Sequence, residues 1–136
     1  MSKRILVVED QADNRRILQD LLTSAGYEII LAENGQEALE VVARERPNLI
    51  LMDIQLPLVD GYEATRRIKA DPVLRAIPII VITSYALSGD ESKAKAAGCD
   101  AYVAKPFSPR ALLCRVTRYA RCDVCSANRG RPRTSL

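Results

Sequence analysis

LILMDIQLP, at residues 49–57, is the stretch of this sequence that decides the fold. Four apolar residues run directly into Asp53, and Pro57 follows shortly after. A short, continuous apolar run bounded by a turn signal is typical of a strand buried on both faces of a parallel sheet. The stretch therefore predicts a strand over 49–52 that displays the Asp53 carboxylate at its carboxyl end.

A second apolar run, over residues 5–8, ends in two further acids, Glu9 and Asp10. If the two strands are parallel neighbours, their carboxyl ends meet at one edge of the sheet, and three carboxylates converge there. Like charges held close together repel one another and favour a bound cation. The two stretches together predict a cation site built from carboxylates.

The rest of the chain alternates short apolar runs with segments of helical periodicity. Strands are predicted at residues 5–8, 28–32, 49–52, 79–82 and 101–104. Helices are predicted at residues 13–25, from 34–35 up to Pro47, at 62–70, at 88–97, and from Ser108-Pro109 through Tyr119. Five strand–helix repeats predict an α/β fold, a doubly wound five-stranded parallel sheet with helices on both faces.

The helical periodicity also predicts which side chains the helices bury. The expected buried face of the first helix comprises Ile17, Leu18, Leu21, Leu22 and Ala25, and that of the second comprises Ala38, Leu39, Val42 and Ala43.

Composition places the chain among globular proteins of one domain. It has 136 residues, of which 48% are hydrophobic, and 20 basic residues face 17 acidic ones. The basic excess lies at the carboxyl end, so we expect a globular domain over 1–120 followed by a basic, disordered tail over 121–136. No apolar stretch has the roughly 18 residues needed to span a bilayer, which predicts a cytoplasmic protein without a membrane anchor. The four cysteines are interpreted as reduced thiols, with Cys99 and Cys114 in core patterns.

Polar residues follow the predicted strands at the edge where doubly wound sheets place their functional sites. Glu9 and Asp10 follow the first strand, Asp53 the third, Thr83 the fourth and Lys105 the fifth. One edge of the sheet is therefore predicted to gather three acids, a hydroxyl and a cation.

These residues, in this order, resemble the receiver domain of two-component response regulators. The resemblance extends from about Lys3 to Tyr119. It is carried by Glu9-Asp10, Asp53, Pro57, Gly61, Thr83, Tyr102 and Lys105-Pro106-Phe107. It implies a flavodoxin-like (βα)5 fold with strand order 2-1-3-4-5.

The resemblance also implies a role for each residue of the site. Asp53 would accept a phosphoryl group from a histidine kinase or a histidine phosphotransfer protein, and Lys105 would contact that group. Thr83 and Tyr102 would be the switch pair. Mg²⁺ would be held by Glu9, Asp10, Asp53 and the backbone carbonyl of Gln55.

The charges and donors of these residues agree with those roles. A divalent cation offsets the repulsion between an attacking carboxylate and a phosphoryl donor, and Mg²⁺ prefers oxygen ligands. The Lys105 ammonium and the Thr83 hydroxyl suit the equatorial phosphoryl oxygens.

Each of these site residues could instead have a purely structural role. Asp53, or the Glu9-Asp10 pair, can cap the helix that follows, and Thr83 can be a turn hydroxyl. A tyrosine such as Tyr102 is more often a half-buried strand aromatic than a switch, and Lys105 can be a solvated loop charge.

The expected output of such a chain is a docking event. Phosphorylation would change the surface formed by the predicted helix 88–97, the strand 101–104 and the last helix, where a downstream protein would bind. The chain ends about where a receiver ends, which resembles stand-alone receivers that act through protein contacts. We expect no enzyme activity beyond slow self-dephosphorylation.

Two other functions remain open at this stage. The segment Arg129-Gly130-Arg131-Pro132-Arg133 resembles an AT-hook core, which would add a DNA contact to the receiver, although a solvated tail is the simpler interpretation. An aspartyl phosphatase shares an acceptor aspartate after a strand, but it would need a second aspartate where Gln55 stands.

Cys122 and Cys125 form a CxxC without a second pair or any histidine, so we interpret them as incidental.

Overall fold

Five parallel strands form one sheet in the order β2-β1-β3-β4-β5. The computed structural model describes residues 3–54, 56, 59–83, 90–104 and 108–129. The strands are β1 (Arg4–Val8), β2 (Glu28–Ala32), β3 (Leu49–Asp53), β4 (Ile79–Thr83) and β5 (Ala101–Ala104). The helices are α1 (Ala12–Ser24), α2 (Gly35–Glu45), α3 (Gly61–Ala70), α4 (Asp90–Ala97) and α5 (Pro109–Arg129). The predicted α/β fold and strand order are confirmed.

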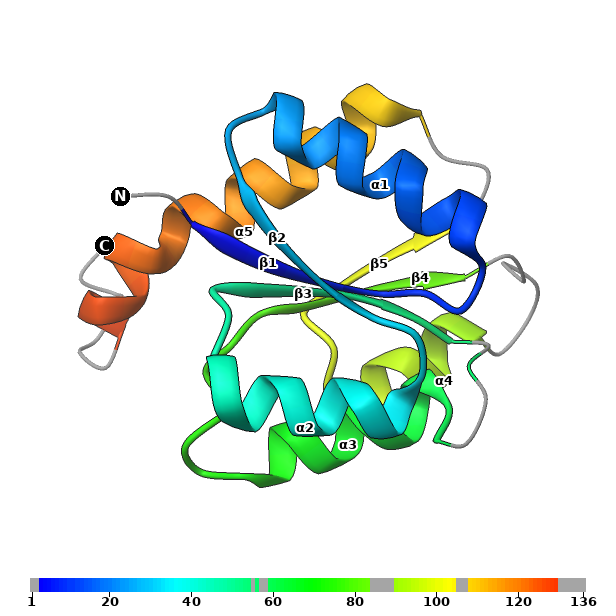
Figure 1. Cartoon of the computed structure of the whole chain (residues 1–136). Coiled ribbons are helices and arrows are strands. Elements are labelled where there is room, and N and C mark those ends of the chain that lie inside the picture. Colours follow the sequence, from blue (N-terminus) through cyan, green and yellow to red (C-terminus); the bar gives the residue numbers. More distant parts are fainter. Residues whose placement is uncertain (1–2, 55, 57–58, 84–89, 105–107, 130–136) are drawn as a thin grey trace.

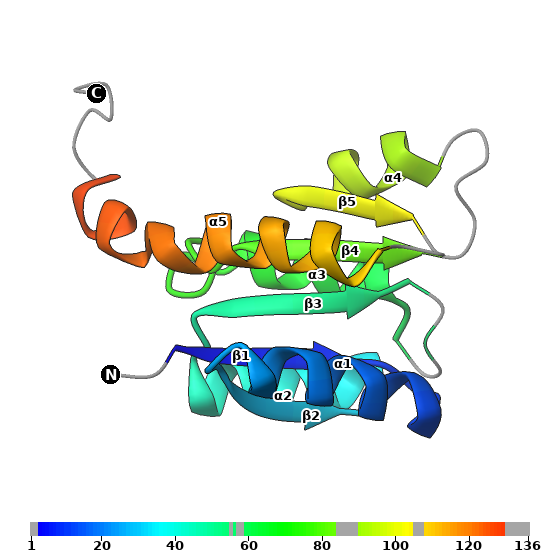
Figure 2. The same cartoon turned by 90° about the horizontal axis from the view of Figure 1, so that it is seen from above.

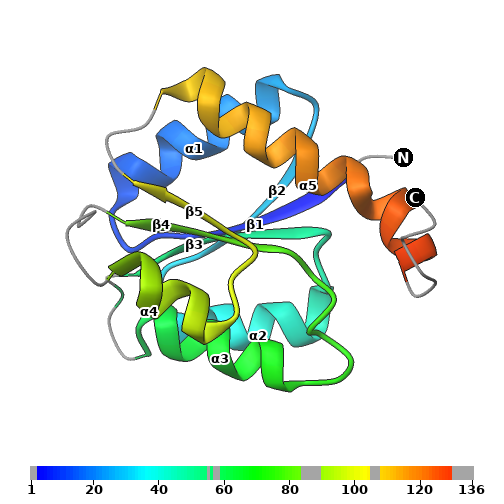
Figure 3. The same ribbon diagram turned by 180° about the vertical axis from the view of Figure 1, so that it is seen from behind.

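Helices cover both faces of the sheet. Figures 1 and 3 show α1 and α5 on one face and α2, α3 and α4 on the other. Alternate residues of a strand point to opposite faces, so each strand feeds two separate cores. In β1, Leu6 and Val8 join the core beneath α2 and α3, while Ile5 and Val7 join the core beneath α1 and α5. This burial on both sides explains the continuous apolar runs in the sequence.

The buried stripe of α1 is narrower than the periodicity predicts, and α2 buries Val41, which is not among the predicted residues. Leu18 and Leu22 are 4% and 0% exposed, but Ile17 is 58% exposed. Ala25 and Ala43 are also exposed. Leu18 and Leu22 lie four residues apart on the row of α1 that faces the core, and a residue one position away is rotated by about 100°. The prediction that Ile17 is buried was therefore wrong.

Side-chain caps fix the starts of three helices. The Asn34 side chain accepts a hydrogen bond from the Glu37 backbone N–H at 2.7 Å, and Asp60 does the same for Glu63 at 2.9 Å. The Ser108 hydroxyl accepts from the Ala111 backbone N–H at 3.0 Å, as the sequence predicted. These caps begin α2, α3 and α5 at the carboxyl edge of the sheet.

The last helix is longer than predicted. It continues through Arg129, beyond Tyr119. Figure 2 shows its final turns projecting past the amino ends of the strands. Within the described part of the chain, no helix is long and apolar enough to cross a bilayer. The division into a domain over 1–120 and a separate tail stays a prediction.

Side chains of α5 bind backbone carbonyls at the edge strand β5. The Tyr119 hydroxyl donates to the Asp100 carbonyl, with an O···O distance of 2.9 Å, and Arg115 donates to the Tyr102 carbonyl at 3.3 Å. Because β5 has β4 on one side only, half of its backbone groups have no strand partner. The helix thus satisfies two carbonyls at this edge.

Lys69, whose side chain is 16% exposed, lies at the amino edge of the sheet, where the strands begin. The Lys69 ammonium lies within 2.8 to 3.0 Å of the Arg75 and Ile77 carbonyls and the Asp100 carboxylate. The same Asp100 oxygen accepts the Ile79 backbone N–H at 2.8 Å. Lys69 therefore joins the end of α3, the loop before β4 and the turn before β5.

Candidate functional site

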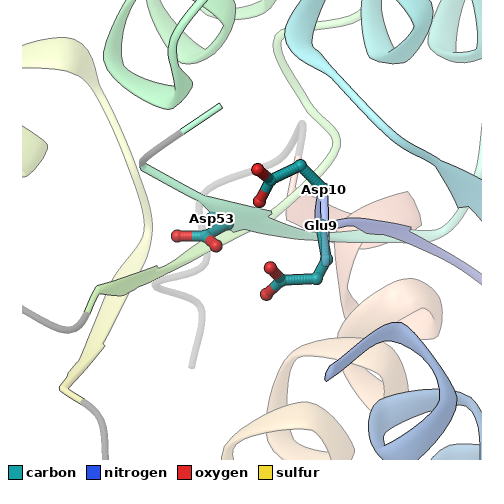
Figure 4. Close-up of side chains that lie close together, drawn as sticks. All are labelled: Glu9, Asp10 and Asp53. Atoms are coloured by element: carbon teal, nitrogen blue, oxygen red, sulfur yellow. The ribbon is translucent and has the colours of Figure 1, made fainter. Parts of the chain in front are cut away.

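Three carboxylates meet where β1 and β3 end. The register of the two strands pairs Val8 with Met52, so the acids that follow them lie side by side. One carboxylate oxygen from each of Glu9, Asp10 and Asp53 lies within 4.8 Å of the others. Figure 4 shows the three side chains pointing toward a common space. The structure thus brings together the acids that the sequence placed at one edge.

The cluster is buried on one side and open on the other. Glu9 is 2% exposed and Asp53 is 6% exposed, whereas Asp10 is exposed. The Glu9 backbone N–H donates to the Ala32 carbonyl at 3.0 Å, which extends the pairing of β1 with β2 by one residue. The Glu9 carboxylate accepts the Gln11 backbone N–H at 3.3 Å. These contacts fix Glu9 and leave access from the side of Asp10.

The donor set fits a hard divalent cation. Mg²⁺ takes oxygen ligands at about 2.1 Å in an octahedron, in which ligand oxygens are about 3 Å apart when adjacent and about 4 Å apart when opposite. Three carboxylate oxygens within 4.8 Å need small side-chain rotations to reach that geometry. The negative charges of the three carboxylates also attract a divalent cation to this place. Glu9, Asp10 and Asp53 can therefore hold a magnesium ion.

A glycine lets α3 begin directly against the end of β3. The Gly61 backbone N–H donates to the Ile54 carbonyl at 2.9 Å. A Cβ atom added at Gly61 would lie 2.2 Å from the Asp53 carbonyl oxygen and 2.7 Å from the Ile54 Cα. Both contacts are with backbone, which cannot rotate away as a flexible side chain can. Gly61 therefore permits the close approach that fixes the backbone of Asp53.

The other predicted site residues are placed less completely. Thr83 is the last residue of β4, one position beyond Ile82, the register partner of Asp53. Tyr102 lies in β5, is half-buried and packs against the core beneath α2 and α3. Lys105 and Gln55 lie outside the described residues. The phosphoryl-contacting and switch roles of Thr83, Tyr102 and Lys105 stay predictions. The metal-binding role of the Gln55 carbonyl also stays a prediction.

The structure describes the carboxyl-terminal segment as far as Arg129. Arg129, the first residue of the arginine motif, ends α5, and residues 130–133 lie outside the described part of the chain. Cys99 is a half-buried free thiol, and burial together with the nearby Asp100 charge raises its pKa to about 11. Cys114 is also a free thiol, but it is exposed on α5, so its assignment to a core pattern was wrong. It lies on the outer side of a helix whose buried positions are Leu112 and Val116.

The sequence interpretation missed one residue beside the site. Arg15 on α1 donates from Nη1 to the main-chain carbonyl of Glu9, with an N···O distance of 2.8 Å. The sequence contains a signal for this contact, because an arginine about one turn into a helix can reach back to the loop that precedes the helix. That signal is weak, because long basic side chains near a helix start are usually solvated.

Most of the chain matches one protein family. The family model of the response regulator receiver domain matches residues 5–117. The matched segment runs from the second residue of β1 into α5, so it contains the sheet and the three acids.

Named relatives and solved structures agree with the family model. The polar-differentiation response regulators DivK of Brucella anthropi and Brucella ovis are 47% and 45% identical over 108 residues, which cover 79% of this chain and 88% of each relative.

A receiver domain of a sensor histidine kinase from Pseudomonas aeruginosa, solved with a magnesium ion coordinated in its active site cleft, has a TM-score of 0.83 and 39% identity. The match covers 89% of this chain and 99% of that one. A CheY-like receiver domain protein from Methanospirillum hungatei has a TM-score of 0.84 and 31% identity, with 90% and 97% covered. With its sheet order, its carboxylate cluster and these matches, the chain belongs to the response regulator receiver family of two-component signalling.

Proposed function

We propose that this chain is a phosphorylation-controlled receiver that takes a phosphoryl group onto Asp53 from a phosphohistidine. The donor is a histidine kinase or a histidine phosphotransfer protein. The observation that carries this proposal is the meeting of Glu9, Asp10 and Asp53 at the carboxyl edge of a receiver fold, with oxygens within 4.8 Å of one another. None of the 136 residues is a histidine, so the phosphohistidine donor lies outside this sequence.

Asp53 is the proposed acceptor because of its place among the three acids. It ends the central strand β3, and the close approach of Gly61 fixes its backbone. A carboxylate oxygen of Asp53 forms a bond to phosphorus while the bond from phosphorus to the donor imidazole nitrogen breaks, and the imidazole leaves with the electron pair. The product is an acyl phosphate on Asp53 and a free histidine on the donor.

Mg²⁺ is the proposed cofactor of this transfer. Asp10, Asp53 and the backbone carbonyl of Gln55 would bind the ion directly, and Glu9 would bind it directly or through water. When bound, the ion offsets the repulsion between the acceptor carboxylate and the phosphoryl oxygens. The exposed side of the cluster at Asp10 is the side from which a donor reaches Asp53.

Lys105 and Thr83 are proposed to contact the phosphoryl oxygens. Lys105 follows β5 and Thr83 ends β4, the two strands beyond Asp53 in the sheet. An ammonium and a hydroxyl donor stabilise the charge that spreads over the three equatorial oxygens. The acyl phosphate then hydrolyses slowly, because no second aspartate stands at Gln55 to act as a general base.

The proposed output is protein docking on the face formed by α4, β5 and α5. The new dianion attracts the Thr83 hydroxyl, and the Tyr102 side chain moves toward the space that becomes free. A partner that binds the altered face also favours the phosphorylated state, since the coupling is reciprocal. We place this exchange in the cytoplasm, where ATP supplies the donor kinase.

Intact-protein mass spectrometry tests the acceptor assignment. The protein is incubated with acetyl phosphate, with and without Mg²⁺, as wild type, Asp53→Asn and Asp20→Asn. Asp20 is an exposed aspartate of α1 and serves as the matched control. We expect one Mg²⁺-dependent phosphoryl adduct on the wild type and on Asp20→Asn, and none on Asp53→Asn. Stoichiometric labelling of Asp53→Asn would show that another residue is the acceptor.

A further inference from the structure

Arg15 holds the backbone segment that carries two of the three site carboxylates. Its Nη1 donates to the Glu9 carbonyl at 2.8 Å, and its Nη2 lies 3.9 Å from the Glu33 carboxylate. The Arg15 side chain is 17% exposed and that of Glu33 is 67% exposed. Exposed ion pairs at this distance contribute little, whereas a charged donor to a buried acceptor contributes substantially. The contact with Glu9 is therefore the stronger of the two.

The Glu9 residue is held from three directions. Its N–H donates to the Ala32 carbonyl, its side chain accepts from the Gln11 N–H, and its carbonyl accepts from Arg15. The partners in the first two contacts are backbone groups, the Ala32 carbonyl and the Gln11 N–H. The third depends on a side chain that a substitution can remove. Because Glu9 is 2% exposed, its carbonyl would lose a partner in a place with little access to water.

The Glu9 carbonyl belongs to the peptide unit that joins Glu9 to Asp10. A peptide unit is planar, so fixing its oxygen also fixes the backbone from which the Asp10 side chain starts. Asp10 is exposed and has little packing of its own to hold it. The direction in which its carboxylate points therefore depends on the orientation of this peptide unit.

We infer that Arg15 is a positioning residue for the metal site: it orients the peptide unit between Glu9 and Asp10 so that both carboxylates reach the space beside Asp53. The inference rests on the proposed function, since it assumes that the three acids hold Mg²⁺. The proposed role of Arg15 involves no contact with the ion or with the phosphoryl group. Residues that orient metal ligands typically change metal affinity by roughly ten-fold or more when replaced.

The positive charge of Arg15 should change the Mg²⁺ affinity in the opposite sense to its orienting hydrogen bond. A cation near three carboxylates repels a second cation, so loss of the charge alone would tighten Mg²⁺ binding. Loss of the orienting hydrogen bond would weaken binding. The sign of the change in affinity therefore separates a positioning role from a purely electrostatic one.

Arg16 provides a matched control for this comparison. It follows Arg15 on α1 and is exposed, and its side chain makes no hydrogen bond or ion pair with the described part of the chain. Arg16→Gln removes one positive charge next to the same site and leaves the Glu9 contact in place. Neither variant should unfold α1, because Leu18 and Leu22 anchor that helix in the core.

Isothermal titration calorimetry of the full chain with MgCl₂, in the absence of a phosphodonor, tests the inference. We expect Arg15→Gln to bind Mg²⁺ roughly ten-fold more weakly than the wild type. Arg15→Lys, which restores one donor without the planar fork, should bind about three-fold more weakly. Arg16→Gln should bind as the wild type does or slightly more tightly. Circular dichroism without Mg²⁺ checks that each variant is folded.

Affinity for Mg²⁺ in Arg15→Gln equal to or above that of Arg16→Gln would overturn the inference. If Arg15→Gln fails to fold, Arg15→Lys decides, and an affinity equal to that of the wild type would then reject the positioning role. Wild-type protein that binds no Mg²⁺ would remove the metal site of the proposed function, and this inference with it. Weaker Mg²⁺ binding in the Arg15 variants, without weaker binding in Arg16→Gln, would support the positioning role of Arg15. That result would leave the proposed function intact.

Discussion

The two edges of the sheet treat charge in opposite ways. At the amino edge, opposite charges pair: Lys69 lies 2.8 Å from the Asp100 carboxylate, and Arg4 lies 3.0 Å from the Glu45 carboxylate. At the carboxyl edge, three like charges lie within 4.8 Å of one another. Opposite charges held together attract one another, whereas like charges held together repel one another and cost stability. The amino edge therefore holds loops together, whereas the carboxyl edge carries the cluster that could bind a metal ion.

The difference follows from the geometry of a doubly wound sheet. Loops beyond the carboxyl ends of neighbouring strands converge on a shared crevice, so side chains from β1 and β3 meet there. The amino edge carries the returns from helix to strand, and its charges join loops to one another. Lys69 illustrates this, since one ammonium contacts the loop before β4 and the turn before β5.

Gly61→Ala should give the largest effect, at the carboxyl edge. The added Cβ would lie 2.2 Å from the Asp53 carbonyl oxygen, so the start of α3 or the end of β3 has to move. We expect the free energy of unfolding in urea to fall by about 3 kcal/mol, with weaker Mg²⁺ binding.

Gly26→Ala is the control for that substitution. Gly26 has φ of +97° and no atom within 4 Å of an added Cβ, so its cost is conformational, about 1 kcal/mol. Equal losses for the two glycine variants would mean that the end of β3 is not held by close contact.

Lys69→Met should affect the fold and leave the site unchanged. The substitution keeps most of the apolar stem and removes an ammonium that contacts two carbonyls and Asp100. We expect a loss of about 2 kcal/mol in chemical denaturation and unchanged Mg²⁺ affinity. Lys93→Met, at an exposed position of α4, serves as control. A parallel loss of Mg²⁺ affinity would show that the two edges are energetically coupled.

Mg²⁺ should stabilise the wild type through the carboxyl edge. At a free concentration ten times its Kd, the ion adds about 1.4 kcal/mol to the free energy of unfolding by mass action. Asp10→Asn should lose most of that gain, and without Mg²⁺ it should be at least as stable as the wild type, because one like charge is gone. Thermal denaturation with and without Mg²⁺ measures both. An undiminished Mg²⁺ effect in Asp10→Asn would remove that residue from the ligand set.

Glu63 should give the smallest effect, on the exposed face of α3. Hydrogen bonds from Arg66 and Arg67 hold the pKa of the Glu63 carboxyl below its usual value of 4.5. A lowered folded pKa contributes stability above the unfolded pKa and loses it as pH falls through the folded pKa. Glu63→Gln should therefore be slightly less stable than the wild type at neutral pH and low salt, with the difference vanishing in acid. A difference that persists in acid would point to packing rather than charge.

The sequence predicted the sheet well because burial on both faces leaves a strong pattern. Apolar runs such as residues 49–52 have no polar alternation, and each is followed by a turn signal and a helix. Asp53, Glu9 and Asp10 were placed at one edge by topology alone, and their oxygens do lie together. The strand order came from the family resemblance rather than from periodicity.

The errors concern surfaces, where the pattern is weak. Ile17 and Cys114 are apolar residues on exposed sides of α1 and α5, and periodicity alone does not distinguish the centre of a buried stripe from its margin. The contact of Arg15 with Glu9 depends on a side-chain conformation that spacing does not specify. The expected roles of Thr83, Tyr102 and Lys105 depend on a phosphorylated state and stay predictions.

The hydrogen bonds from α5 to β5 bear on aggregation. An open strand edge is a template on which another chain can add a strand. Here the Arg115 and Tyr119 side chains already engage the Tyr102 and Asp100 carbonyls. A second copy would have to break these contacts before pairing along this edge. The same helix that contributes to the proposed docking face thus protects the chain from sheet extension, so a partner there has to recognise side chains rather than an exposed backbone.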